Sequence, residues 1–250
     1  MPAENTKNIL SQLQKDILLL QGYKPASSAA VDLGLGPLKE AFPNGSFPLS
    51  AVHEFLSEGA EGAAATNGFV SGLLAPLMGR GGISLWISSA RTLFPPALKN
   101  FGIQPDRIIF IDLQREKDVA WAMEEALKCS ALTAVVGEMK EISFKDSRRL
   151  QLAVEQSQVT GFILRNSTRK VNTTACISRW KITPLPSESL DDLPGIGFPQ
   201  WKVELLRIRN GRTRIWEIKW EGGQFRDITQ TVVSEVQTGL EITKLLSRSA

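Results

Sequence analysis

The segment Gly59-Ala60-Glu61-Gly62-Ala63-Ala64-Ala65-Thr66 has the spacing of a phosphate-binding loop. Such a loop reads glycine, four residues, glycine, lysine and then serine or threonine. Its lysine reaches the β- and γ-phosphates, and its hydroxyl holds Mg²⁺. Here Gly59 and Thr66 stand in place and Gly62 lies between them, but Ala64 replaces the second glycine and Ala65 replaces the lysine. Because a methyl group cannot offset the charge of a triphosphate, we expect a degenerate loop and no bound cofactor.

Other catalytic or metal-binding constellations are absent from the sequence. The only histidine, His53, lies inside an apolar run, and we expect it to be a core residue rather than a general base. No His, Cys and carboxylate cluster has metal-ligand spacing, so no metal site is expected. Cys129 and Cys176 stand apart in apolar surroundings, which predicts two buried thiols in a reducing cytoplasm. The N-terminus lacks the features of a secretion signal.

The charge is unevenly distributed along the chain. Residues 1–144 carry 12 Lys and Arg against 15 Asp and Glu, a net −3, whereas residues 145–250 carry 17 against 11, a net +6. The C-terminal portion is therefore where an anionic partner such as nucleic acid would bind. Ordinary solvated surface charge accounts for a local +6 equally well.

Short apolar strands alternate with helical segments between residues 31 and 166. Strands are predicted at 51–56, 83–88, 107–111, 132–136 and 160–164, and helices at 66–78, 94–101, 118–129 and 146–157. Asp118 and Asp146 are the expected N-caps of the last two helices. This alternation indicates an α/β fold, with a mostly parallel twisted sheet and helices on both faces.

The two ends of the chain have a different character. Residues 5–21 form an expected amphipathic helix with Ile9, Leu13 and Ile17 on one face, followed by a small-residue linker, so that 1–30 is a segment able to bind a partner or pack in cis. After a strand at 174–182, two β-rich runs, 201–209 and 212–220, are joined by Asn210-Gly211, a strong signal for an antiparallel hairpin. The core is thus assigned to 31–222, and 223–250 is a tail and a candidate partner-binding segment.

The stretch LGLGPLKEAFPNGSFPLSAVHE, residues 33–54, resembles the approach to the phosphate loop in RecA-type recombinases. The resemblance continues through residues 59–66, apart from the alanines, and reaches Asn166, where recombinases open their second DNA-binding loop. More narrowly, Val52-His53-Glu54 and the closing residues 201–220 are similar to the ImuA family, RecA-fold accessory proteins of bacterial error-prone repair cassettes. The likeness covers about residues 31–222.

The departures from an active recombinase agree with one another. Arg91 stands where the resemblance places the catalytic carboxylate, and a cation cannot activate water. The strand at 132–136 meets Gly137 where the magnesium-associated aspartate should be, and Glu138 comes one residue late. With Ala65 in place of lysine, three parts of phosphoryl transfer are missing, so the chain is predicted not to be an enzyme.

Two basic loops are candidates for DNA contact. Arg165, Arg169 and Lys170 flank the expected second DNA-binding loop, which offers no aromatic ring for stacking. The hairpin adds a set clustered about its turn: Arg207, Arg209, Arg212 and Arg214. For each residue an ordinary solvated position is an equal alternative. Trp216 and Trp220 on the hairpin form either core or an apolar face for a partner.

The ImuA resemblance implies a scaffold of DNA-damage-induced mutagenesis. It would bind an inactive, ImuB-like Y-family polymerase homologue and work with an error-prone replicative-type polymerase and RecA. DNA contact and assembly into a homo-oligomer stay open, and no membrane partner is expected. One alternative is a SulA-like inhibitor of cell division, which shares the degenerate recombinase fold. The other is an ATPase with an unorthodox loop, which the missing lysine disfavours.

Overall fold

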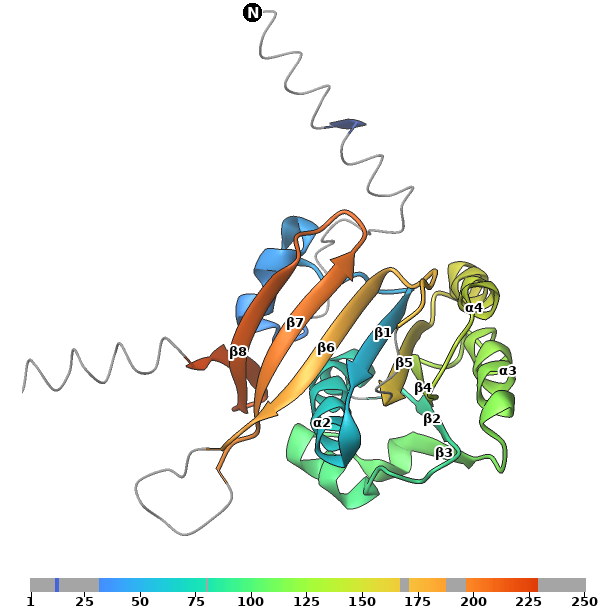
Figure 1. Ribbon diagram of the computed structural model, residues 1–250, viewed down its shortest axis with the longest axis horizontal. Coiled ribbons are helices and arrows are strands. Elements are labelled where there is room, and N and C mark those ends of the chain that lie inside the picture. Colours follow the sequence, from blue (N-terminus) through green and yellow to red (C-terminus); the bar gives the residue numbers. More distant parts are fainter. Residues whose placement is uncertain (1–11, 14–31, 80, 167–170, 188–196, 229–250) are drawn as a thin grey trace, which may run out of the picture.

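One mixed sheet organises the part of the chain that the computed structural model describes, residues 12–13, 32–79, 81–166, 171–187 and 197–228. Its strand order is β3-β2-β4-β5-β1-β6-β7-β8-β9 (Figure 1). The pairings from β3 across to β6 are parallel, and those from β6 to β9 are antiparallel. The predicted α/β class, with a mostly parallel sheet and a C-terminal antiparallel hairpin, is confirmed. The strands are β1 (Val52–Ser57), β2 (Ser84–Ser88), β3 (Ile108–Asp112), β4 (Ala134–Glu138), β5 (Thr160–Asn166), β6 (Ser178–Leu185), β7 (Gln200–Ile208), β8 (Arg214–Glu221) and β9 (Gln224–Asp227).

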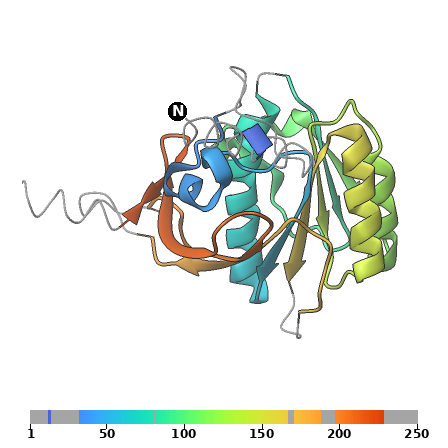
Figure 2. The same ribbon diagram turned by 90° about the horizontal axis from the view of Figure 1, so that it is seen from above.

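Helices cover both faces of the parallel strands. Helix α2 lies on one face and α3 and α4 lie together on the other (Figure 2). The parallel strands β1, β2 and β4 are therefore buried along nearly their whole length, including the polar His53 and Glu54 of β1. The helices are α2 (Gly59–Met78), α3 (Glu116–Leu127) and α4 (Phe144–Ser157), with 3₁₀ turns η1 (Gly36–Ala41), η2 (Pro43–Gly45), η3 (Pro95–Phe101) and η4 (Pro105–Arg107).

The expected N-caps of α3 and α4 are wrong by three residues. Ser143 caps α4, because its Oγ accepts a hydrogen bond from the Asp146 backbone N–H at 3.0 Å and donates one to the Asp146 carboxylate at 2.6 Å. Asp118 likewise lies at the third position of α3, where it pairs with the N-cap residue Arg115 at 2.7 Å. Both aspartates stabilise the helix starts, but from within the first turn, where an acidic side chain complements the helix dipole.

The antiparallel strands curve around α2 and bury it with aromatic rings. Trp216 and Trp220 of β8 are 8% and 5% exposed, so both are core residues, and the interpretation of them as a partner-binding face is wrong. The ring of Phe225 lies 4.9 Å from that of Trp220 and 5.0 Å from that of Phe69 on α2. Phe225 belongs to β9, a strand that the sequence analysis had assigned to the C-terminal tail.

His53 lies fully buried in β1, as predicted from the sequence. Its Nδ1 is 2.7 Å from the Ser178 hydroxyl, and its Nε2 is 2.7 Å from the Pro48 carbonyl oxygen. Both ring nitrogens therefore have partners inside the core. Burial disfavours the charged imidazolium and lowers the pKa of His53 to about 3. The hydrogen bond to Pro48 raises the pKa but only partly offsets the effect of burial.

The two cysteines have different environments. Cys176 is buried, and because burial disfavours the charged thiolate, the pKa of its thiol rises to about 12. Cys129 is exposed after the end of α3, so the prediction that it is buried is wrong. Across the described residues, none of the helices combines the length and the apolar character needed to span a bilayer.

We predict that Gly72→Ala destabilises the fold. A methyl group at Gly72 in α2 would meet Phe225 Cζ at 2.8 Å and Trp220 Cζ3 at 3.0 Å. Overpacking of this kind costs about 1–3 kcal/mol, which exceeds the roughly 1 kcal/mol that alanine gains over glycine in a helix. Chemical denaturation should show a net loss of up to about 2 kcal/mol. Gly81→Ala, with open space around the added atom, is the control, and equal effects of the two would contradict this packing.

A second prediction concerns pH. Because the pKa of His53 is about 3 when folded and about 6.5 when unfolded, the unfolded chain binds more protons below pH 6.5. Stability is therefore complete above that value and falls with acidification, by about 2 kcal/mol between pH 7 and pH 5 from this residue. In an untagged protein, NMR of the only imidazole should show no titration in this range. Titration near pH 6.5 in the folded protein would contradict the buried position.

Candidate functional site

The start of α2 differs from the loop expected there. β1 ends at Ser57 and α2 begins at Gly59, whose φ of 71° turns the chain directly from strand into helix. The residues expected to form a degenerate phosphate loop are therefore the first two turns of α2. From Ala63 onward the backbone N–H groups lie within the intrahelical ladder. They do not converge on a point outside the helix as the amides of a phosphate loop do.

These two turns have one buried side, formed by Gly62, Ala65 and Thr66, whereas residues 59–61 and Ala64 are exposed. Gly62 packs against the Ser57 side chain. Ala65, at the lysine position, is 9% exposed and belongs to the core between α2 and the sheet. Thr66 is 1% exposed, and its hydroxyl oxygen has no hydrogen-bond partner among the described residues. A lysine at position 65 would thus enter the core instead of reaching a phosphate.

A cavity of about 260 Å³, here called the carboxyl-edge cavity, lies beside this helix start, where parallel α/β sheets bind ligands. Its charged lining residues are Glu116, Glu138 and Lys140, and Lys140 forms an ion pair with Glu116 at 3.7 Å. Glu138 is therefore left without a cation among the described lining residues. The lining comprises Ser57, Ala63, Thr66, Asn67, Ser88, Ser89, Ala90, Thr92, Glu116, Glu138, Met139, Lys140, Leu164 and Asn166.

Glu138 is held by neutral hydrogen-bond donors. It is the last residue of β4, two residues beyond the strand end predicted from the sequence. Its carboxylate accepts hydrogen bonds from Trp86 Nε1 at 2.6 Å, Ser88 Oγ at 3.0 Å and Thr92 Oγ1 at 2.7 Å. These bonds tie the ends of β2 and β4 together and hold the carboxylate at the cavity wall.

Arg91, which stands at the expected position of the catalytic carboxylate, is not among the residues that line the cavity. The Ser88 hydroxyl accepts hydrogen bonds from the N–H groups of Ala90 and Arg91, each at 3.1 Å, and Arg91 takes a φ of 49°. Its guanidinium pairs with Asp112 at the end of β3, 2.8 Å away. The turn after β2 therefore directs this cation to the sheet edge.

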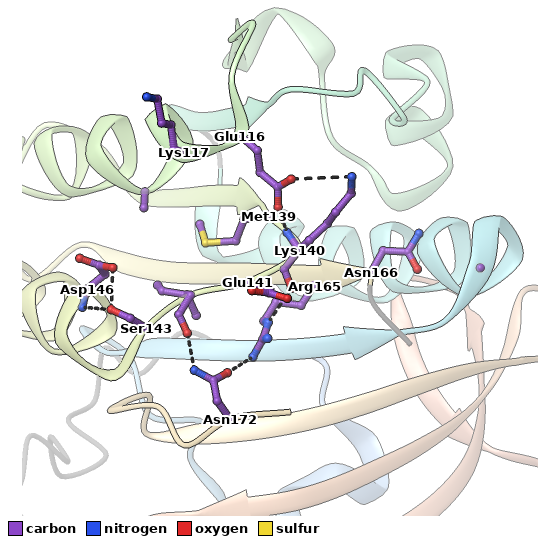
Figure 3. A pocket seen from close by; sticks show the side chains of 13 residues that line it. Glu116, Lys117, Met139, Lys140, Glu141, Ser143, Asp146, Arg165, Asn166 and Asn172 are labelled. Atoms are coloured by element: carbon purple, nitrogen blue, oxygen red, sulfur yellow. Dashed lines mark hydrogen bonds and ion pairs between the residues drawn. The ribbon is translucent and has the colours of Figure 1, made fainter. Parts of the chain in front are cut away.

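A wider groove of about 1280 Å³ continues from the cavity past Gly59 (Figure 3). Its charged lining is balanced, with Glu116, Glu141 and Asp146 against Lys117, Lys140 and Arg165. Figure 3 shows Lys140 turned to Glu116 and Asp146 to Ser143, so these groups are engaged with neighbours. The groove thus offers no net positive charge to a triphosphate.

The one buried charge cluster of the described residues centres on Glu54 of β1. This carboxylate is fully buried. It accepts hydrogen bonds from Arg165 Nη1 of β5 at 2.6 Å and from Arg179 Nε of β6 at 2.7 Å. The Thr174 hydroxyl donates a third hydrogen bond at 2.9 Å. Asn172 joins the cluster, since its Oδ1 accepts from Arg165 at 3.2 Å. The network binds three adjacent strands to the segment that precedes β6.

Sequence reasoning missed this cluster. A glutamate inside an apolar strand is a signal of a buried ion pair, because a charge is rarely buried without a partner. Its partners lie more than a hundred positions away, at Arg165 and Arg179, and only the parallel pairing of β5 and β6 with β1 brings them together.

Arg165 does not fit the DNA-contact interpretation. It is 4% exposed, and its guanidinium is committed to Glu54, to the Lys140 carbonyl and to Asn172. The assignment of Arg165 to DNA phosphates is therefore wrong. Arg169 and Lys170, the other candidates of this loop, lie outside the described residues.

The hairpin arginines have separate environments. Arg207 is half-buried, and its Nη2 donates to the carbonyl oxygens of Thr174 at 3.0 Å and Cys176 at 2.7 Å. Arg214 pairs with Glu40. Arg209 and Arg212 are exposed near the turn, where Asn210 takes the expected positive φ, 59°.

Little of the predicted N-terminal helix can be placed. Ile9 and Ile17 lie outside the described residues, whereas Leu13 is helical and 51% exposed. In the described ranges there is no group of three or more His, Cys, Asp and Glu side chains that could hold a metal ion.

Comparison with known proteins identifies two relatives. The chain is 35% identical over 187 residues to Protein ImuA of Caulobacter vibrioides, covering 70% of this chain and 77% of that protein. It is 31% identical over 114 residues to the cell division inhibitor SulA of Photorhabdus laumondii, covering 44% of this chain and 64% of that protein. No family profile matches.

Among solved structures, the RadB recombinase superposes with a TM-score of 0.54 at 13% sequence identity, covering 79% of this chain and 99% of that one. At this identity the likeness concerns the fold alone. The RecA-like fold predicted from the sequence is confirmed.

We predict that Arg165→Met lowers the free energy of unfolding and has no separate effect on DNA affinity. Removing one partner of a buried charge cluster costs about 3 kcal/mol or more. Arg115→Met, which breaks an exposed pair on α3, is the control and should cost under about 1 kcal/mol. Chemical denaturation measures both. An Arg165→Met protein of wild-type stability that has lost DNA affinity would restore the DNA-contact interpretation.

Proposed function

Since the chain belongs to the ImuA family, we propose that it is a non-catalytic accessory protein of DNA-damage-induced mutagenesis. In this role it acts in the cytoplasm as a scaffold for translesion synthesis. It recruits an inactive Y-family polymerase homologue and works with an error-prone replicative-type polymerase, RecA and DNA.

The observation that carries the proposal is the burial of Ala65 in the core at the start of α2. In an active enzyme of this fold the lysine at that position must reach the β- and γ-phosphates. Here the helix start takes the place of the loop, and the adjacent cavity presents Glu138 without a cation among its described lining residues. A site with this charge disfavours a triphosphate, which supports a role in recruitment over one in hydrolysis.

Exposed apolar side chains also support recruitment. Three large apolar side chains are each more than 60% exposed. They are Phe94, which precedes η3, Trp121 of α3 and Ile215 of β8. Large apolar groups of this kind are the usual anchors of protein interfaces.

The proposal is tested by co-expressing the tagged chain with its cognate inactive Y-family polymerase homologue. We expect the two to co-purify through size-exclusion chromatography. An active Y-family polymerase from the same cell serves as the control and should not be retained. Separate elution of the chain and the inactive homologue would contradict the proposal.

Inhibition of cell division is a second candidate function, favoured by the match to SulA. Adding the protein to division tubulin in a sedimentation assay distinguishes the two functions. The scaffold proposal predicts unchanged filament yield, and a dose-dependent loss of filaments would favour the second candidate.

A matched pair of substitutions tests the loss of nucleotide chemistry. Ala65→Lys places a cation in the core and should destabilise the protein by several kcal/mol. Ala64→Lys, at the exposed neighbouring position, should be tolerated within about 0.5 kcal/mol. Neither variant should hydrolyse ATP in a phosphate-release assay. An Ala65→Lys protein that folds stably and turns over ATP would overturn this interpretation of the site.

A further inference from the structure

A third cavity, of about 400 Å³, has its own lining, although Phe144 and Thr173 of this lining directly follow the groove residues Ser143 and Asn172 in the chain. It is enclosed by the first turns of α4, the segment 173–177 before β6 and the end of β7. We call it the arginine cavity. It shares no lining residue with the carboxyl-edge cavity or the groove, and its lining comprises Phe144, Arg148, Thr173, Thr174, Ala175, Cys176, Ile177, Arg207, Ile208 and Arg209.

The charge of this cavity is of one sign. Arg148, Arg207 and Arg209 line it, and none of its described lining residues is acidic. The carboxyl-edge cavity, by comparison, has Glu116 and Glu138 against Lys140. Among these cavities, the one suited to an anion is therefore the arginine cavity.

The walls of the arginine cavity are fixed by hydrogen bonds. The Arg207 guanidinium holds the carbonyl groups of Thr174 and Cys176 through Nη2. The Ala175 N–H donates to Ser147 Oγ of α4 at 3.0 Å, and the Arg209 N–H donates to the Ile177 carbonyl at 2.9 Å. The cationic groups of β7 and α4 are thus presented on a connected frame rather than on separate mobile loops.

An aromatic ring stands beside these cations. Phe144 is the first residue of α4 and is 56% exposed, although its side chain is strongly apolar. Arg148 follows four residues later, so the ring and the guanidinium share one face of the helix. A ring for a base and guanidiniums for the phosphates are the combination by which proteins bind single strands without sequence preference.

We propose that the arginine cavity binds single-stranded nucleic acid, with a base against Phe144 and the phosphodiester backbone along Arg148 and the β7 arginines. An acidic peptide such as oligoglutamate would use the same cations but carries no aromatic ring to stack on Phe144, so the nucleic acid is favoured. The inference rests on the DNA contact of the proposed function and not on its protein partners. It replaces Arg165 with Phe144 and Arg148 as the DNA-binding residues that the structure indicates.

The test measures fluorescence anisotropy of a labelled oligodeoxythymidine strand titrated with the purified full chain at several salt concentrations. Phe144→Leu should weaken binding about five-fold or more, because it removes the stacking ring. Arg148→Ala should weaken binding and lower the slope of log affinity against log salt by about 0.7 to 1. Thermal unfolding of each variant checks that the fold is intact.

Two control variants test whether binding depends on this site or only on the overall number of arginines and exposed rings. Arg149→Ala removes a neighbouring α4 arginine that pairs with Glu124, and Phe94→Leu removes an equally exposed ring elsewhere. Both should bind the strand as the wild type does. Equal loss in Arg148→Ala and Arg149→Ala, no binding of the strand, or Arg148-dependent binding of oligoglutamate in its place would overturn the proposal. Phe144→Leu should still co-purify with the polymerase homologue, so failure of this site leaves the recruitment role standing.

Discussion

The buried carboxylate of Glu54 is the constraint on which the rest of the structure depends. It is fully enclosed, so it requires cations, and it takes them from β5 and β6 on either side of β1. Through Thr174 and Asn172 it also fixes the segment before β6. That segment forms one wall of the arginine cavity, whereas the Arg165 guanidinium is committed to Glu54 and Asn172. The Glu54 carboxylate thus gives Arg165 and Arg179 a structural role inside the protein.

The same allocation of charge leaves the carboxyl-edge cavity without an unpaired cation among its described lining residues. Arg91 pairs with Asp112, and Lys140 pairs with Glu116. Ala65 lies in the core at the position where a phosphate-binding cation would be needed. The recombinase frame is retained, because its strands and aromatic core do not depend on the lost groups. What persists is a rigid body with exposed apolar side chains and a separate cationic cavity, which suits the assembly of other components.

Sequence patterns predicted the parallel strands, the antiparallel hairpin and the buried His53, because each depends on local residue types. The expected two-residue turn is wrong in detail: β7 and β8 pair only as far as Leu205 and Arg214, and of Asn210 and Gly211 only Asn210 takes a positive φ. The patterns did not predict the start of α2, since a run of glycine and alanine reads equally as a loop or as helical turns. The caps of α3 and α4 were misplaced because an aspartate suits both the N-cap and the third position. The Glu54 cluster and the burial of Trp216 and Trp220 arise from contacts between distant strands, which no local pattern records.

The central claim is that the retained frame no longer binds a nucleotide at the start of α2. Isothermal titration calorimetry of the purified chain with ATP and Mg²⁺ tests it most directly, with Thr66→Ala as the comparison protein. The account predicts no saturable heat up to millimolar nucleotide for either protein. Saturable micromolar binding by the wild type that Thr66→Ala abolishes would contradict it.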